Sequence, residues 1–169
     1  MWLNKARVPT VAAEMVRDLL SHRDIETDSP AETRADLEAV LNQYVDDLQD
    51  LTREIRDVAA KRGLQGSELG RLKAQLTAKR GIKTDEEGID YVLDQLLEML
   101  MHSHAVDEVY APDHELRLRL RGPLRRQMQE RDAVEDEVRG QMKHVQEGSA
   151  MWEVEYQRLK EQVLKRKGL

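Results

Sequence analysis

The feature that most constrains the fold of this chain is a run of apolar residues spaced alternately four and three positions apart. This spacing is typical of a helix that buries one narrow face against another helix. The residues between these positions are almost all polar, so the opposite face of the helix meets solvent. The sequence therefore predicts a long helix over about residues 31–62, which needs a packing partner along its length. The apolar run comprises Leu37, Leu41, Tyr44, Leu48, Leu51, Ile55 and Val58.

The composition supports extended amphipathic helices. Of the 169 residues, 36% are charged, 40% are apolar and only 4% are aromatic, with no Phe. The net charge of -6 argues against a general attraction to nucleic acid. The chain has no Cys, which excludes disulfides and thiolate metal sites. No run approaches the ~18 apolar residues that a membrane span needs, so we expect a soluble, cytoplasmic protein that does not associate with membranes.

An internal duplication is the second strong pattern. The apolar face of the first helix reappears 81 residues later, as the face of a helix ending near Met101. Extended links at 24–27 and 106–111, long helices at 31–62 and 113–145, and shorter basic-ended helices then follow in the same order. The sequence therefore predicts two helical repeats, 1–82 and 83–169, that share one core. The repeated positions are Val8, Val11, Ala12, Met15, Val16, Leu19 and Leu20, matched by Ile89, Val92, Leu93, Leu96, Leu97, Leu100 and Met101.

Helix ends are marked by local signals. Capping boxes open helices at Ser29–Glu32 and Thr84–Glu87, and Gly63 and Gly81 are placed to end the helices before them. Residues 116–121 alternate Leu and Arg, which suits a half-buried strand. Because the corresponding segment of the first repeat is helical in pattern, we predict helix there, with a kink near Pro123.

The stretch Gly148–Tyr156, with the ending Lys165–Leu169, resembles a bacterial family catalogued as domain of unknown function 507. The opening Leu3–Lys5 and the segments Asp113–Arg117 and Pro123–Arg125 are similar to the same family. The resemblance spans nearly the whole chain and implies two tandem copies of the module, the first without a counterpart of Trp152. It implies an all-helical bacterial protein, and supplies no catalytic residue.

A stripe of arginines is the candidate nucleic-acid site. Arg117, Arg121 and Arg125 lie four residues apart, so they share one helix face, with Arg126 beside them. Such a stripe could contact phosphates. Acidic residues flank it and no aromatic residue is interleaved, so a solvated face held in ion pairs is the alternative interpretation.

A second candidate site is a stripe led by aromatic residues in the last helix. Trp152, Tyr156, Leu159 and Val163 recur at steps of four, three and four. Trp and Tyr are enriched at interface hot spots, but they also fill cores. The sequence leaves open whether these side chains are core or interface.

Signals for chemistry are weak. His102, His104 and His114 are not at helical ligand spacing, and no catalytic motif is present. We therefore predict no catalytic, cofactor or metal site. The sequence favours an all-α, elongated helical bundle whose long helices, 31–62 and 113–145, pair as an antiparallel, coiled-coil-like core. Its expected function is non-catalytic protein binding or scaffolding, with an unknown partner or as a homodimer across residues 37–58. A nucleic-acid-associated factor is the alternative.

Overall fold

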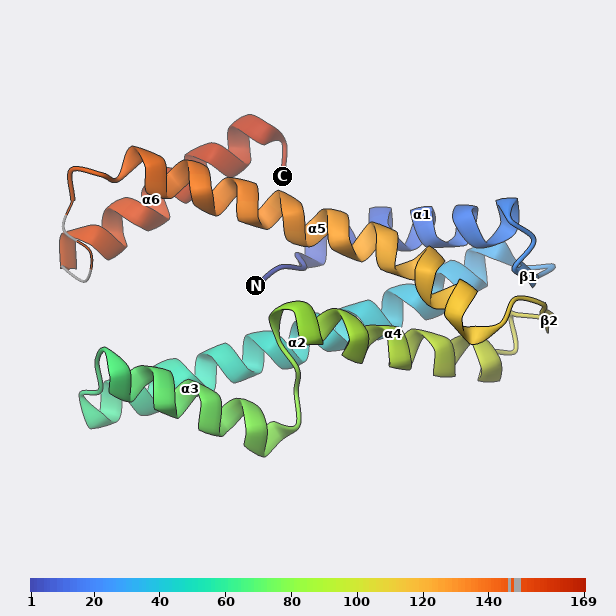
Figure 1. Ribbon diagram of the computed structural model, residues 1–169, viewed down its shortest axis with the longest axis horizontal. Coiled ribbons are helices and arrows are strands. Elements are labelled where there is room, and N and C mark those ends of the chain that lie inside the picture. Colours follow the sequence, from blue (N-terminus) through green and yellow to red (C-terminus); the bar gives the residue numbers. More distant parts are fainter. Residues whose placement is uncertain (146, 148–149) are drawn as a thin grey trace. The chain divides into compact units, whose positions relative to one another are not determined.

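A computed structural model describes every residue of the chain except 146, 148 and 149. The predicted all-α fold is confirmed, because the described residues contain only one pair of strands, each two residues long (Figure 1). A 3-10 turn, η1, precedes the first α-helix. In chain order the elements are η1 (Lys5–Arg7), α1 (Val8–Ser21), β1 (Ile25–Glu26), α2 (Pro30–Arg62), α3 (Ser67–Arg80), α4 (Asp85–His102), β2 (Glu108–Val109), α5 (Asp113–Gln141) and α6 (Ala150–Lys167).

The chain forms two compact units. Unit 1 consists of residue 1 and residues 3–125, and unit 2 consists of Trp2 and residues 126–169. The boundary falls inside α5, two residues after Pro123, through which the helix continues. These units are defined by contacts, whereas the two repeats with a boundary at residue 82 remain a prediction from the sequence.

The core of unit 1 is built around the first half of α2, which packs against α1 and α4 (Figure 1). The seam predicted from the sequence is buried from Leu37 to Leu51, and Tyr44 within it is 1% exposed. The hydroxyl of Tyr44 donates a hydrogen bond to the carbonyl oxygen of Lys83 at 2.8 Å, which satisfies its polar end. The apolar faces of α1 and α4 complete this core.

The second half of α2 forms a helical hairpin with α3, here called the α2–α3 arm (residues 52–80; Figure 1). The last two positions of the predicted seam, Ile55 and Val58, lie here and are only half-buried. From α3, Leu72 and Leu76 are buried against α2, whereas Leu69 is exposed. The arm is therefore a thin two-helix structure with a narrow apolar contact.

Both predicted glycine stops are confirmed. Gly63 and Gly81 have φ of 64° and 66°, the left-handed conformation that a residue with Cβ adopts only at a cost. The predicted capping at Ser29 is different in detail, because its side chain makes no capping hydrogen bond. Instead, Thr27 Oγ1 accepts the N–H of Ser29 at 3.0 Å. Thr27 thus accepts the backbone N–H of Ser29, which the capping box would have paired with the Glu32 side chain.

The two extended links pair with each other as an antiparallel ribbon. Ile25 lies opposite Val109 and Glu26 lies opposite Glu108. Residues 116–121 are helical, and α5 begins at Asp113 as predicted. It ends at Gln141, four residues before the predicted end, and a turn follows.

Unit 2 has its own small core, formed by the last part of α5, the turn that follows it and α6. Partly buried side chains, including Trp152 and Tyr156, pack around the core. The buried residues are Val134, Val138, Met142, Leu159 and Val163.

None of the described helices is both long enough and apolar enough to cross a membrane.

Candidate functional site

The arginine stripe of α5 faces α4 within unit 1 and is paired with acidic side chains there. Arg117 binds Asp94, and Arg121 binds Asp90. One turn further along, Arg125 Nη2 lies 3.9 Å from Glu86 Oε2. Because both sets of residues recur every four positions on antiparallel helices, the pairs form a regular ladder, here called the α4–α5 ladder. Its positive charge is compensated by carboxylates of the same chain.

Two other arginines of this segment are also engaged. Arg119 Nε donates to Asp24 Oδ2 at 2.9 Å, and the Asp24 side chain is 4% exposed. Burying a carboxylate is costly unless it is paired, so this contact ties α5 to the turn before β1. Arg126 is exposed on α5 in unit 2 and interacts with other groups of the protein.

The aromatic-led stripe of α6 divides into a buried and a half-buried part. Leu159 and Val163 are 7% and 2% exposed and belong to the core of unit 2. Trp152 and Tyr156 are half-buried, and their rings stack with centroids 5.0 Å apart and an interplanar angle of 15°. Burial, and secondarily the charge of Glu135, raises the pKa of Tyr156 above its ordinary value.

Two apolar side chains are exposed together on another face of α6. Met151 and Val154, one helical turn apart on α6, are 76% and 70% exposed. On the same helix, Glu155 accepts hydrogen bonds from the Arg158 guanidinium, which lowers the pKa of that carboxyl. The start of α6 therefore presents apolar contact area next to a fixed charge pair.

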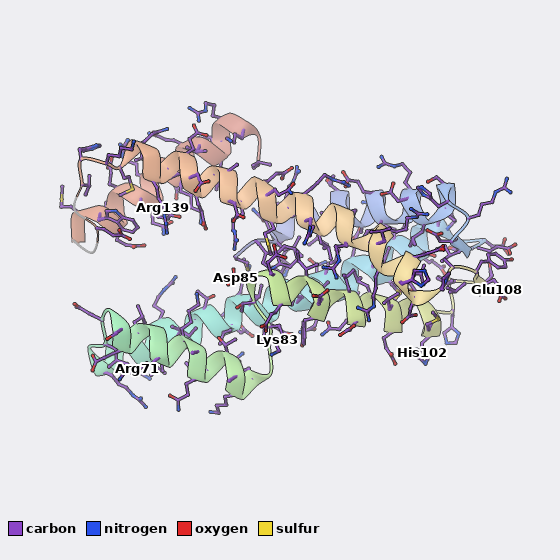
Figure 2. All side chains as sticks on the ribbon, in the orientation of Figure 1. Arg71, Lys83, Asp85, His102, Glu108 and Arg139 are labelled. Carbon is purple, nitrogen blue, oxygen red and sulfur yellow. The ribbon has the colours of Figure 1, made fainter. Side chains whose placement is uncertain are left out.

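A depression lies between the start of α2 and the end of α4. Ser103 Oγ donates to Asp36 Oδ2 at 2.5 Å within it, and the site is open to solvent. His102 is exposed at its edge (Figure 2), and His114 lies on the first turn of α5. In the part of the chain that the structure describes, no three His, Asp or Glu side chains are grouped to hold a metal ion. The lining residues are Glu32, Ala35, Asp36, Met99, His102, Ser103, His104 and Ala105.

Helix α3 and the turns beside it carry a further group of surface residues that helical spacing does not reveal. The cations on and around α3 are exposed, and they are not spaced regularly enough to form a single line. A count of charge in a local window along the sequence would have found them.

A comparison with curated proteins gave no match. A comparison with family models gave a match over residues 1–169 to the family described as a protein of unknown function (DUF507). Because that match covers the whole chain, the chain belongs to the DUF507 family.

Proposed function

We propose that the chain is a non-catalytic helical module of the bacterial cytoplasm that binds a partner protein through the start of α6. The observation that carries this proposal is the joint exposure of Met151 and Val154, one helical turn apart on the face of α6 that does not carry the Trp152–Tyr156 stack. Aromatic and Met side chains are enriched where proteins meet, and apolar groups left exposed together favour such a contact. Leu159 and Val163 would then hold α6 in place and would not touch the partner.

A non-catalytic function is supported by the position of the buried carboxylate. Catalytic acids and bases typically lie in a cleft, where burial and neighbouring charges shift their pKa values. Asp24 is the one fully buried acid among the described residues, and its carboxylate is bound by Arg119. It therefore serves to join α5 to the β1 turn.

The α4–α5 ladder favours protein binding over nucleic-acid binding through Arg117, Arg121 and Arg125. A phosphate that approached these side chains would have to displace carboxylates of α4, and that competition reduces the gain from counterion release. The ion pairs of the ladder support the second interpretation of this arginine stripe, a solvated face held in ion pairs.

We also propose that the two halves are tandem copies of one ancestral module. The starts of β1, α2 and α3 each precede those of β2, α5 and α6 by 83 residues. This offset exceeds the 81 residues between the apolar faces of α1 and α4, because the link after α4 is two residues longer. Several buried positions coincide at the larger offset, among them Leu41 with Leu124 and Leu76 with Leu159.

Site-specific photo-crosslinking in the native bacterium tests the partner surface. A photoreactive residue replaces Val154 in one variant, and replaces Leu118, 67% exposed on α5, in a control. We expect discrete cross-linked products at position 154 only. Products that contain two copies of the chain would show that the partner is a second copy and that the protein forms a homodimer.

The purified partner should then bind the full chain, and the Met151→Ser/Val154→Ser variant should lose at least about tenfold in affinity, as for interface anchors. Both residues are exposed, so the helix content measured by circular dichroism should not change. Identical products at positions 154 and 118, or unchanged affinity of the double variant, would contradict the proposal.

A further inference from the structure

Positive charge is concentrated in one segment of this acidic chain. Residues 61–83 contain seven Lys or Arg and one acidic residue, Glu68, a net charge of +6. Since the whole chain has a net charge of -6, the remaining residues carry -12. The segment covers the end of α2, all of α3 and the turn after it. Its cations are Lys61, Arg62, Arg71, Lys73, Lys79, Arg80 and Lys83.

Among the described residues, most of these cations have no acidic partner. Arg80 binds Glu54 across the arm, with Nη2 and Oε2 2.6 Å apart. Lys83 lies 3.4 Å from Glu87, and both side chains are more than half exposed. For the other five cations, the described part of the chain offers no carboxylate within ion-pair distance, although all five are exposed. This is the opposite of the α4–α5 ladder, where each arginine of the stripe is matched.

The outer face of α3 is smooth between its cations. Gly70, Ala74 and Ala78 follow one another at intervals of four, so they form a line along the helix. A Cβ added at Gly70 would meet no atom within 4 Å, which shows that no group of the described protein covers this position. At about 100° per residue, Arg71 and Lys73 flank this line on either side. Figure 2 shows Arg71 on α3 and Lys83 in the turn that follows.

A smooth face flanked by cations suits a rod of regularly spaced negative charge better than a folded protein. Protein interfaces depend on a few large side chains that fill pockets, and a line of Gly and Ala provides none. Phosphate contacts need only Lys, Arg and close approach. Residues 61–83 also contain no aromatic side chain, so they lack the stacking platform with which proteins bind single strands.

We propose that α3 and its flanking turns bind the phosphodiester backbone of double-stranded nucleic acid without sequence preference. Arg71 and Lys73 supply the contacts on either side of the Gly70–Ala78 line, which lets the duplex approach the helix, and the exposed Lys61, Arg62 and Lys79 add positive charge elsewhere on the same arm. This surface differs from the arginine stripe of α5 and from the start of α6. The proposal for α3 is therefore independent of the partner proposed for α6.

Fluorescence anisotropy with the full chain tests this proposal. The probes are labelled duplex DNA, duplex RNA and single-stranded DNA, each of mixed sequence, and an acidic polyglutamate peptide. We expect both duplexes to bind in preference to the single strand and the peptide. The logarithm of the binding constant should fall linearly with the logarithm of salt concentration, by about 0.9 for each phosphate neutralised. A preference between the two duplexes would identify the nucleic acid.

The key variant is Arg71→Gln/Lys73→Gln/Lys79→Gln. It should lower affinity for duplex at least about tenfold at physiological salt and reduce the salt slope by at least about 2, for the phosphates no longer neutralised by Arg71 and Lys73. The control is Lys5→Gln/Arg34→Gln/Arg158→Gln, which removes the same charge from cations paired with Asp46, Glu38 and Glu155. The control should bind duplex within about twofold of the parent, since none of its residues lies on the proposed surface.

Several outcomes would overturn the proposal. These are failure of the parent chain to bind duplex at about 50 mM salt, equal losses in the two triple variants, and equal or tighter binding of the single strand. Preferential binding of polyglutamate would instead assign the surface to an acidic protein. Circular dichroism of each variant should match the parent, and a loss of helix confined to the key variant is resolved by the single substitution Lys73→Gln, which should lower the slope by about 1.

Discussion

At the scale of single residues, the Asp24–Arg119 contact is the feature most sensitive to substitution. The Asp24 side chain is 4% exposed, whereas the carboxylates of the α4–α5 ladder are mostly exposed. Removing one partner of a buried pair leaves an uncompensated charge and costs about 3–5 kcal/mol, whereas an exposed pair contributes about 0–1 kcal/mol. The cost of breaking the Asp24–Arg119 pair should lie near the lower end of the range for buried pairs, about 3 kcal/mol, because Arg119 remains 29% exposed.

We therefore predict that Arg119→Gln lowers the free energy of unfolding by about 3 kcal/mol, and that Arg121→Gln lowers it by less than about 1 kcal/mol. Urea denaturation followed by circular dichroism measures both. The two substitutions remove the same group from the same helix, so they differ chiefly in the burial of the carboxylate left behind. Equal losses would show that the buried position of Asp24 is not what makes the contact important.

Tyr110 reports on the ribbon formed by β1 and β2. Its hydroxyl donates a hydrogen bond to Glu26, and this bond, with smaller contributions from burial and from the charges of Glu26 and Glu108, raises the pKa of Tyr110 above 10.0. The neutral hydroxyl is thus favoured in the folded state. Its contribution to stability is complete below the unfolded pKa and is lost as pH rises through the folded pKa.

We predict that Glu26→Gln shifts the titration of Tyr110 down toward 10.0. Tyrosinate absorbance measures the titration midpoint of Tyr110. The titration of a Tyr110→Phe variant is subtracted to remove the signal of the other tyrosines. Glu38→Gln, which alters a carboxylate paired with Arg34 on α2, should leave the midpoint where it is. A midpoint that Glu26→Gln does not move would mean that the hydrogen bond is not formed in solution.

At the scale of elements, the helices could be predicted because their signals are local. Gly63 and Gly81 end helices where the sequence places them, since the left-handed conformation is cheap only for glycine. The cap at Ser29 could not be predicted in the same way. Thr27 and Glu32 are both close enough in sequence to bind its N–H, and tertiary contacts decide between them. Thr27 is also held by the segment that follows α4, because its Oγ1 donates to the carbonyl oxygen of Ala105.

The Leu and Arg alternation at 116–121 shows how a strand-like pattern arises in a helix. Leu116 and Leu120, one turn apart, are fully buried, whereas Leu118 is 67% exposed. Arg117 and Arg121 face the acids of α4, and Arg119 reaches Asp24 in a different direction. The alternation with a period of two therefore arises from three separate causes: burial of two leucines, pairing of two arginines with α4, and the contact of Arg119 with Asp24. None of these contacts is visible to a periodicity count.

The candidate sites were predicted less completely than the helices, for a related reason. The stripe from Trp152 to Val163 is real as a helix face, but burial divides it between core and surface. The sequence gives the face and not the size of the core, and α6 packs on too little structure to cover all four side chains. The α3 surface has no period at all, so only its charge density distinguishes it.

At the scale of the whole molecule, the two units differ in how much apolar surface they bury. Unit 1 encloses the faces of α1 and α4 and the first half of α2, with many side chains less than 2% exposed. Unit 2 has little beyond residues 126–169 from which to build a core, and chains of this size are marginal on their own. The α2–α3 arm is thinner still, since α3 buries only Leu72 and Leu76. Local stability should follow this order of burial.

Native-state hydrogen exchange should therefore resolve at least two levels of protection. Amides of α1, α4 and the first half of α2 should exchange only on global unfolding, whereas those of α3 and α6 should exchange through smaller openings at lower free energy. Leu96→Ala, in the core of unit 1, should lower the protection of the first group by about 2–5 kcal/mol. The openings of α3 should change little by comparison, because the arm can separate without exposing that core. One uniform free energy of exchange for all helices would instead mean that the arm and unit 2 open only when the core of unit 1 does.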